Sequence, residues 1–243
     1  MTPVVVVTGG GSGIGAATCA ALIAEGMRVA VLDLDFDAAK AVAAGDAFSC
    51  AVDVADEDSV HAAFAAVHEE FGRVDVLVAN AGITGSPQAG PCHSTPVSEW
   101  DRVHAVNVRG PYLCARAVLP GMLERGSGHI ITVASVAGMI AFPGRCAYTT
   151  SKGAALMFAR SLAVDYGRLG IRSNAVCPGM VHTPMTAWRL DDPELREAME
   201  AKVPLGRVAA PEEIAEAITL LATGRLAYMN GSAVVLDGGW TSI

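Results

Sequence analysis

The sequence is poor in aromatic residues, in basic runs and in long apolar segments. Only 5% of its 243 residues are Phe, Trp or Tyr, so Ala, Val, Ile and Leu must build most of the core. The net charge is −8 and no run of Lys or Arg occurs, which argues against a nucleic-acid partner, because phosphate binding needs a basic surface. No apolar run approaches the roughly 18 residues of a membrane span, so we expect no membrane partner.

The sequence also lacks the patterns of a secretory signal and of a metal site. The N-terminus enters an apolar strand at once, without the charged start and cleavage site of a leader. His93 and His104 have no ligand partners at metal spacing. The cysteines show neither a CxxC motif nor metal-type spacing; they are Cys19, Cys50, Cys92, Cys114, Cys146 and Cys177. We therefore expect no metal, and reduced thiols in a cytoplasmic protein.

Apolar segments of strand length alternate with longer segments of helical periodicity. The predicted strands are Val4–Val7, Arg28–Leu32, Ala47–Val52, Val74–Ala79, His129–Ala134, Ile171–Val176 and Ala233–Leu236. Helices are predicted at Ile14–Glu25 and Glu57–Phe71, and two longer ones at Val97–Glu124 and Pro143–Leu169. Repeated strand–helix units indicate crossover connections and a parallel sheet with helices on both faces. We expect one α/β domain over residues 1–243.

One segment breaks this alternation, at residues 179–207. It is rich in Pro, Met and charged residues and precedes a helix that begins near Pro211. A connection of this length is unusual in a compact domain and is typical of a binding loop or lid. We predict that it covers the substrate.

The first predicted strand runs into a glycine-rich turn and then a helix. Glycine permits a positive φ in the turn, close approach of backbone to a pyrophosphate, and close packing of helix against strand. The N-terminus of the helix offers free N–H groups to the phosphates. At the first strand–helix junction this motif strongly predicts a dinucleotide site; its candidate residues are Gly9, Ser12, Gly13, Ile14 and Gly15.

The second predicted strand is followed by a carboxylate that favours NAD over NADP. Asp33 stands 18 positions beyond Gly15, where a carboxylate accepts hydrogen bonds from the adenosine ribose and repels a 2′-phosphate. Ser12 and Leu34 occupy the places where Arg or Lys would pair with that phosphate. The alternative is that Asp33 only forms a turn with Asp35 and Asp37.

Tyr148 and Lys152 are four positions apart on a predicted helix and share one face. The ammonium charge is expected to lower the pKa of the phenol from about 10, so that Tyr148 accepts a proton near neutral pH. Ser135 ends the fifth predicted strand, 13 residues earlier, and its hydroxyl can bind the substrate oxygen. Alone, the Tyr–Lys pair would be read as a surface pair.

The Gly-x-x-x-Gly-x-Gly spacing, together with Asn107, Ser135, Tyr148 and Lys152, resembles the short-chain dehydrogenase/reductase family from end to end. The resemblance implies a single-domain, Rossmann-like, doubly wound parallel sheet of seven strands. It implies a catalytic tetrad of those four residues, in which Asn107 holds a proton-relay water. Tyr148 exchanges the alcohol proton, Ser135 orients the oxygen, and Lys152 holds the ribose. The hydride passes between the carbinol and NAD, whose chemistry the protein orients.

The same resemblance extends the cofactor site and implies an assembly. It places Asp53 and Val54 against the adenine. It assigns Asn80-Ala81-Gly82 to the fourth strand end, where the Asn also ties neighbouring strands together. Pro178-Gly179, Val181 and Thr183 are expected to position the nicotinamide, along with Tyr148 and Lys152. Most relatives are tetramers that assemble through two long helices, so we expect a homotetramer.

The substrate is read by loops, and the fold does not define it. Besides Ser135, the candidate lining residues are Gly90, Pro143, Arg145, Met180, Met185, Trp188 and Arg189. Met and Trp suggest an apolar pocket, and two guanidinium groups suit a carboxylate, sulfonate or phosphate. The segments around Arg145 and Arg189 are similar to those of 2-hydroxypropyl-coenzyme M dehydrogenases, which oxidise an alcohol that carries a sulfonate. Alternatively, both arginines are solvated or pair with Asp191 and Asp192.

Two other functions compete with NAD-dependent alcohol oxidation. The first is an NADPH-dependent 3-oxoacyl thioester reductase acting on acyl carrier protein. Asp33 and the lack of a basic docking face argue against it. The second is a dinucleotide-binding regulator without activity, which the retention of Tyr148 and Lys152 disfavours. The sequence leaves open the substrate, the direction, and whether the C-terminal segment, Trp240–Ile243, closes its own active site or a neighbour's.

Overall fold

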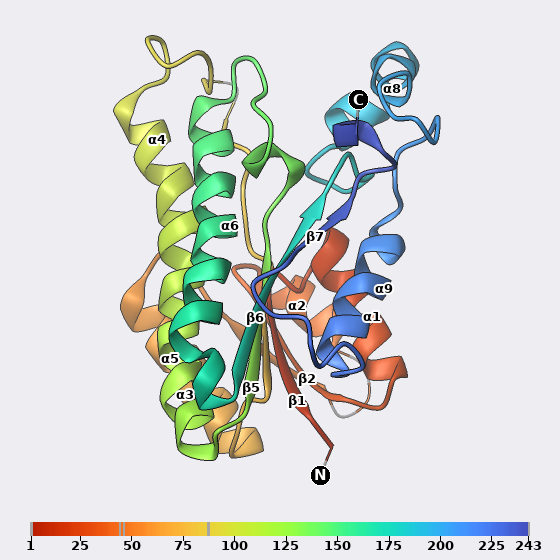
Figure 1. The fold of residues 1–243 in the computed structure, drawn as a ribbon. Helices are drawn as coiled ribbons and strands as arrows, with labels where there is room; N and C mark the ends of the chain where they lie inside the picture. Colours follow the sequence, from red (N-terminus) through yellow and green to blue (C-terminus); the bar gives the residue numbers. More distant parts are fainter. Residues whose placement is uncertain (1, 44, 46, 87, 243) are drawn as a thin grey trace.

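A computed structural model of the protein describes residues 2–43, 45, 47–86 and 88–242. All strands in this part of the chain belong to one parallel sheet, ordered β3-β2-β1-β4-β5-β6-β7 (Figure 1). The predicted seven-stranded doubly wound sheet is confirmed, and each predicted strand lies within two residues of its observed bounds. These are β1 Val4–Thr8, β2 Arg28–Asp33, β3 Phe48–Ala51, β4 Val76–Ala79, β5 Gly128–Val133, β6 Ile171–Pro178 and β7 Ala233–Leu236.

Helices cover both faces of the sheet (Figure 1). One face carries α1 (Gly13–Ala24), α2 (Phe36–Val42) and α9 (Pro211–Ala222). The other carries α3 (Glu57–Phe71), α4 (Val97–His104), α5 (Gly110–Arg125) and α6 (Cys146–Tyr166). Two short helices, α7 (Ala187–Leu190) and α8 (Pro193–Glu200), stand apart from these layers, beyond the end of the sheet where α9 begins (Figure 1). Ile243, the last residue of the C-terminal segment, lies outside the described residues.

The first strand shows why an uninterrupted run of valines suits this sheet. Successive side chains of a strand point to opposite faces. Val4 and Val6 enter the core under α3 and α5, whereas Val5 and Val7 enter the core under α1 and α9. All four are fully buried. A strand in the middle of a two-sided parallel sheet therefore has no polar face to alternate.

The long helix predicted at Val97–Glu124 contains an irregularity that periodicity did not show. Between α4 and α5 the backbone forms a π-helical turn, Ala105–Arg109. Such turns insert an extra residue into a helix and are frequent at functional sites. Here the turn contains Asn107, which is buried and directed toward the sheet edge. The local change of helical pitch therefore positions one predicted catalytic residue.

The parallel arrangement brings the carboxyl ends of all strands to one edge of the sheet. The chain order reverses between β1 and β4, which creates the crevice where doubly wound folds bind ligands. The glycine-rich turn follows β1, Asp33 ends β2, Asn80 follows β4, Ser135 follows β5 and Pro178 ends β6. Among the described residues, no helix has the length and apolarity needed to cross a membrane.

Candidate active site

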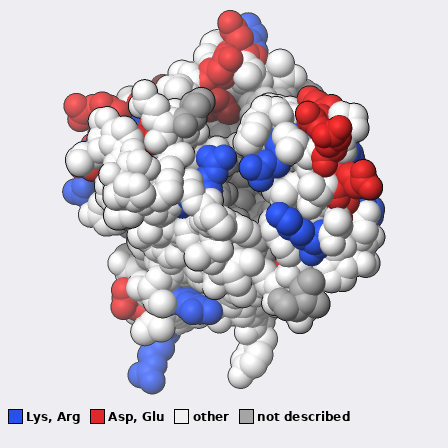
Figure 2. All heavy atoms as spheres, turned by 90° about the horizontal axis from the view of Figure 1, so that it is seen from above, with Lys and Arg blue, Asp and Glu red and all other residues white. Residues whose placement is uncertain are grey.

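A single cleft at this edge, with a volume of about 560 Å³, contains most of the predicted site residues. Of the predicted cofactor residues, all but Gly15 line it; of the tetrad, all but Asn107 line it; and of the substrate candidates, all but Gly90 line it. Gly90 instead exchanges hydrogen bonds with Thr95 in the loop before α4. Figure 2, which views the molecule onto this edge, shows basic side chains gathered around a hollow and acidic ones farther out.

The glycine-rich turn is held by close backbone packing. Gly9 has φ of +63°, a conformation that favours glycine. A Cβ on Gly15 would lie 1.9 Å from the carbonyl oxygen of Gly9, so only glycine fits at that position. The Asn80 side-chain amide donates to the carbonyl oxygens of Thr8 (3.1 Å) and Gly9 (2.9 Å). Asn80 thus ties the ends of β1 and β4 together, as its motif implied.

Asp33 reaches the same turn from β2. Its carboxylate accepts hydrogen bonds from the backbone N–H of Gly11 (2.8 Å) and of Asp35 (3.0 Å). The side chain also lines the cleft, and the neighbouring Leu34 is 73% exposed. Asp33 therefore both shapes the turn and presents negative charge to the cleft, so its two readings from sequence are compatible.

Asn107 acts from behind the cleft wall. Its side-chain amide nitrogen donates to the carbonyl oxygen of Ile83 and to Ser151 Oγ, and its Oδ1 accepts from the N–H of Ile83. Lys152 Nζ donates to the carbonyl oxygen of Val133 at 2.8 Å. A Cβ on Gly82 would lie 3.3 Å from both Asn107 Oδ1 and Lys152 Nζ. Asn107 and Lys152 therefore approach the same point behind the strand ends.

Tyr148 and Ser135 face each other in the cleft. The Ser135 hydroxyl donates to the Pro178 carbonyl oxygen at 3.4 Å and accepts from the N–H of Ala137. The predicted lowering of the Tyr148 pKa is wrong for this structure: burial raises the pKa of the phenol, while its hydrogen bond with Ser135 and the charge of Arg145 only oppose that rise. The Lys152 ammonium lies over the tyrosine ring, 5.9 Å from its centroid.

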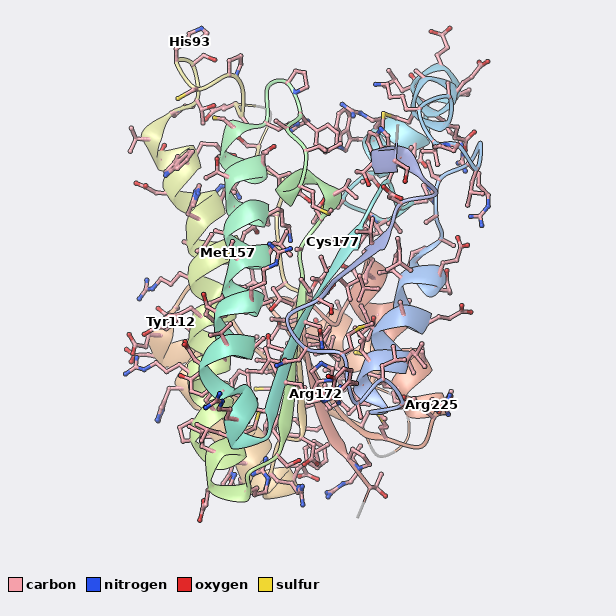
Figure 3. The ribbon with its side chains drawn as sticks, viewed as in Figure 1. His93, Tyr112, Met157, Arg172, Cys177 and Arg225 are labelled. Carbon is pink, nitrogen blue, oxygen red and sulfur yellow. The ribbon has the colours of Figure 1, made fainter. Side chains whose placement is uncertain are left out.

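Burial also acts on Lys152 itself. It lowers the pKa of the ammonium group from 10.5 to about 8, because the surrounding strands desolvate the charge. The nearby Cys177 of β6, labelled in Figure 3, opposes this change. The predicted Tyr–Lys pair is therefore present on one helix face, but desolvation dominates both of its proton equilibria.

Segment 179–207 forms the wall opposite α6 and contains α7 and α8. Its base is fixed by the Thr186 hydroxyl, which donates to the Val181 carbonyl oxygen at 2.6 Å. The predicted lining residues Met180, Met185, Trp188 and Arg189 all face the cleft. The fold also brings in lining residues that the sequence did not predict, from three separate segments: Ile83, Thr84, Phe142, Met199 and Lys202. Trp240, from the C-terminal segment whose role the sequence left open, lines the cleft as well.

Three cationic side chains line this outer part of the cleft: Arg145, Arg189 and Lys202. The alternative partners of the arginines are engaged elsewhere. Asp191 accepts from His182 Nε2 at 2.9 Å, and Asp192 caps α8 by accepting from the first backbone N–H groups. Arg189 lies over the Trp188 ring, 4.8 Å from its centroid. Among the described residues, no carboxylate is paired with Arg145 or Arg189.

Comparison with known proteins decides the family. The family profile described as enoyl-(acyl carrier protein) reductase matches residues 9–241. The chain is 51% identical to 2-(R)-hydroxypropyl-CoM dehydrogenase of Xanthobacter autotrophicus over 250 aligned positions, covering all of both chains. This protein belongs to the short-chain dehydrogenase/reductase family. The predicted family is thereby confirmed.

Two further relatives of the present protein support the same class of reaction. The chain is 41% identical to cis-4-hydroxycyclohexanecarboxylate dehydrogenase of Sinomonas cyclohexanicum, and the alignment covers 99% of this chain and 97% of that one. The crystal structure of levodione reductase superposes with a TM-score of 0.91 at 36% identity, covering 99% and 98% of the two chains. The protein is therefore an oxidoreductase that interconverts secondary alcohols and ketones with a nicotinamide cofactor.

Proposed function

We propose that the protein oxidises, with NAD, a secondary alcohol whose far end carries an anionic group. The observation that carries this proposal is the set of three cations, Arg145, Arg189 and Lys202, in the outer cleft beyond Tyr148. The relatives named for 2-(R)-hydroxypropyl-CoM and for a cyclohexanecarboxylate support it, since both names denote alcohols with an anionic group.

The inner cleft fits a dinucleotide. The cradle of Gly9, Gly13 and Gly15 leaves no room for side chains beside the start of α1, whose N-terminus suits a pyrophosphate. Asp53, Val54, Asn80, Ala81 and Gly82 would line the adenine and ribose side, and Pro178, Gly179, Val181 and Thr183 the nicotinamide side; all of them face the cleft. When bound, the nicotinamide supplies the hydride acceptor for oxidation and the donor for reduction.

The choice of NAD rests on Asp33. Its carboxylate is held at the cleft by the Gly11 amide, where it can accept from ribose hydroxyls and repels a 2′-phosphate. Ser12 and Leu34, the adjacent lining residues, supply no positive charge. NAD is therefore the cofactor that this end of the cleft suits.

The proton chemistry belongs to the tetrad. Ser135 holds the substrate oxygen, and Tyr148 takes the alcohol proton during oxidation or returns it during reduction. Lys152 and Asn107 meet behind the strand ends, where Asn107 would help hold a water that relays protons to Lys152. Burial raises the pKa of Tyr148, which favours the protonated phenol and hence proton donation to a ketone. Oxidation should accordingly accelerate as the pH rises.

Segment 179–207 would act as the substrate lid. It places Arg189 and Lys202 on one wall, while Arg145 belongs to the opposite wall at the start of α6. An anion between them would bring the two walls together through charge-assisted hydrogen bonds. Binding of the anionic group would thus also close the lid over the substrate.

The test is NADH formation from two secondary alcohols of equal length, one ending in a sulfonate and the other in a methyl group. We expect a kcat/KM at least about tenfold higher for the sulfonate, which corresponds to one charge-assisted contact of about 1.4 kcal/mol. The double variant Arg145→Ala/Arg189→Ala should remove that preference and spare the neutral alcohol. Arg116→Ala is the control, because Arg116 pairs with Glu57 on the α3–α5 surface. A preference of the wild type for the neutral alcohol would contradict the proposal.

We also propose a homotetramer, with α4, α5 and α6 at an interface. Tyr112 and Met157, labelled in Figure 3, lie on the outer side of α5 and α6, away from the sheet, and are 49% and 55% exposed. A shallow groove between these helices is lined by Ala105, Val108, Tyr112 and Phe158, with Asp101, His104 and Arg109 also in its lining. Light scattering should give four times the chain mass of 24.9 kDa, and Met157→Glu should reduce it.

A cytosolic location is proposed on the basis of the cysteines. All six are free thiols, and burial raises the pKa of Cys19 and Cys114 to about 12. Such thiols are inert toward exchange and are typical of proteins from reducing compartments.

A further inference from the structure

The C-terminal turn of the protein is locked by a carboxylate. After β7, the Asp237 side chain accepts from the N–H of Gly239 (2.9 Å), the N–H of Thr241 (2.7 Å) and the hydroxyl of Thr241 (2.6 Å). These donors hold the pKa of Asp237 below its usual value, against the effect of burial. Gly238 has φ of +64°, which allows the chain to reverse there. The direction of the following residue, Trp240, is therefore set by the fold.

Trp240 occupies a position between the lid and the opposite wall of the cleft. On the lid side it packs, as Met180 does, against a small apolar cluster of Leu190, Met199 and Val208. On the other side its ring meets Phe142, with ring centroids 5.1 Å apart and an angle of 37° between the planes. Phe142 belongs to the loop before α6 that also carries Arg145. The two aromatic rings thus bridge the two walls.

Both rings also line the cleft itself, together with Met199 and the three cations. Trp240 belongs to the same chain as the tetrad, so the protein supplies this part of its own substrate pocket. Trp240 is half-buried, and the Asp237 turn and the ring contact with Phe142 hold the indole in the wall. A large, flat side chain held in this way acts as a fixed wall, unlike the flexible methionines beside it.

We propose that Trp240 is a specificity-determining residue that sets the size of the alcohol the pocket accepts at its outer part. The proposal deepens the proposed function, because it rests on the assignment of the outer cleft to the substrate. The Asp237–Thr241 turn acts only as a positioning element. A substrate whose carbon skeleton is branched or extended near the tail would meet the indole, whereas a smaller one would pack against it.

The experiment compares a small and a bulky neutral secondary alcohol that differ only in a branch at the chain end, with the wild type and three variants. In Trp240→Ala the ratio of kcat/KM, bulky over small, should rise at least about tenfold, since even one added or missing methylene in an apolar pocket changes kcat/KM by about 10–200-fold. The change should come through KM for the small alcohol, because the tetrad is untouched. The ratio in Trp240→Phe should lie between those of the wild type and Trp240→Ala.

Leu190→Ala is the matched control. Leu190 packs in the same cluster as Trp240 but does not line the cleft. This variant loosens the lid without enlarging the pocket, so it should lower kcat/KM for both alcohols by the same factor and leave the ratio unchanged. If Trp240→Ala does not fold, Trp240→Leu provides the same comparison with a smaller cavity.

An unchanged ratio in the Trp240 variants, or an equal change of ratio in Leu190→Ala, would overturn the proposal. The anion preference is judged separately, from the wild type with a sulfonate and a methyl-ended alcohol. A wild type without that preference would refute the anionic substrate and leave the Trp240 comparison intact, because the latter uses two neutral alcohols.

Discussion

The inner and outer halves of the cleft are built in different ways. The inner half, around the glycine-rich turn, consists of backbone groups and short side chains bonded to backbone, such as Asn80 to Gly9 and Asp33 to Gly11. The outer half consists of long side chains, among which Met185 and Trp188 are 41% and 60% exposed. Backbone packing leaves no space for added atoms, whereas long side chains can repack. The inner half should therefore tolerate few substitutions, and the outer half should change specificity first.

The largest effect is expected where the halves meet, at Tyr148. Tyr148→Phe removes the group that we propose transfers the alcohol proton and should lower kcat about a thousandfold, within the usual range for a general acid or base. Binding of NADH, followed by its fluorescence, should stay within a factor of about two, because the dinucleotide contacts lie in the inner half. Tyr166→Phe, at the far end of the same helix, is the control and should keep full activity. Retained turnover in Tyr148→Phe would remove the tyrosine from the mechanism.

The next effect tests the rigidity of the inner half. In Gly15→Ala the new Cβ would overlap the Gly9 carbonyl oxygen, so the turn must move; the Kd for NADH should rise at least about tenfold, as overpacking costs 1–3 kcal/mol. In Gly121→Ala the new Cβ meets only the flexible end of Arg125, at 3.2 Å, and the Kd should not change. Met185→Ala, in the outer half, should alter the KM for alcohol and leave the Kd for NADH unchanged. If all three variants bind NADH equally, the two halves do not differ in rigidity.

A smaller effect is expected on cofactor choice. Asp33→Asn removes the negative charge that repels a 2′-phosphate, and the ratio of kcat/KM for NAD over NADP should fall about tenfold or more. Asp35→Asn changes a nearby carboxylate that caps α2 through the N–H of Ala38. That variant should keep the wild-type ratio. A ratio that is the same in Asp33→Asn as in the wild type would show that charge at this position does not select the cofactor.

The smallest effect is expected on the pH dependence, through the charge that Arg145 in the outer half exerts on Tyr148. Burial raises the pKa of Tyr148 and Arg145 opposes the rise, so Arg145→Gln should move the pKa further up. Oxidation needs the deprotonated phenol and therefore increases with pH; the rising part of its pH profile should shift to higher pH in this variant. The profile is measured with a neutral alcohol, so that loss of an anion contact does not contribute. Arg189→Gln lines the same cleft and should leave the profile in place; equal shifts in both variants would contradict a specific effect of Arg145 on Tyr148.

Prediction from sequence worked best where one short segment carries the whole feature. The strands were recognised from apolar runs, and the glycine-rich turn, Asp33 and the Tyr148–Lys152 spacing from contiguous motifs. The π-helical turn around Asn107 was not recognised, because a one-residue insertion hardly changes the apolar pattern of a long helix. Phe142 and Lys202 were also missed as lining residues, since they come from separate segments and carry no motif of their own, and for Trp240 the sequence could not say whose active site it closes.

The sequence by itself determined the order of strands and helices and the glycine-rich motif, because each depends on residues close together in the chain, and it predicted the reacting groups through the family resemblance. The tertiary structure alone decided the proton equilibria and the shape of the substrate pocket. The Tyr148 pKa depends on how completely the cleft desolvates the phenol, and burial outweighs the hydrogen bond with Ser135 and the charge of Arg145. The outer wall likewise exists only because folding brings the C-terminal Trp240 against Phe142 and the lid.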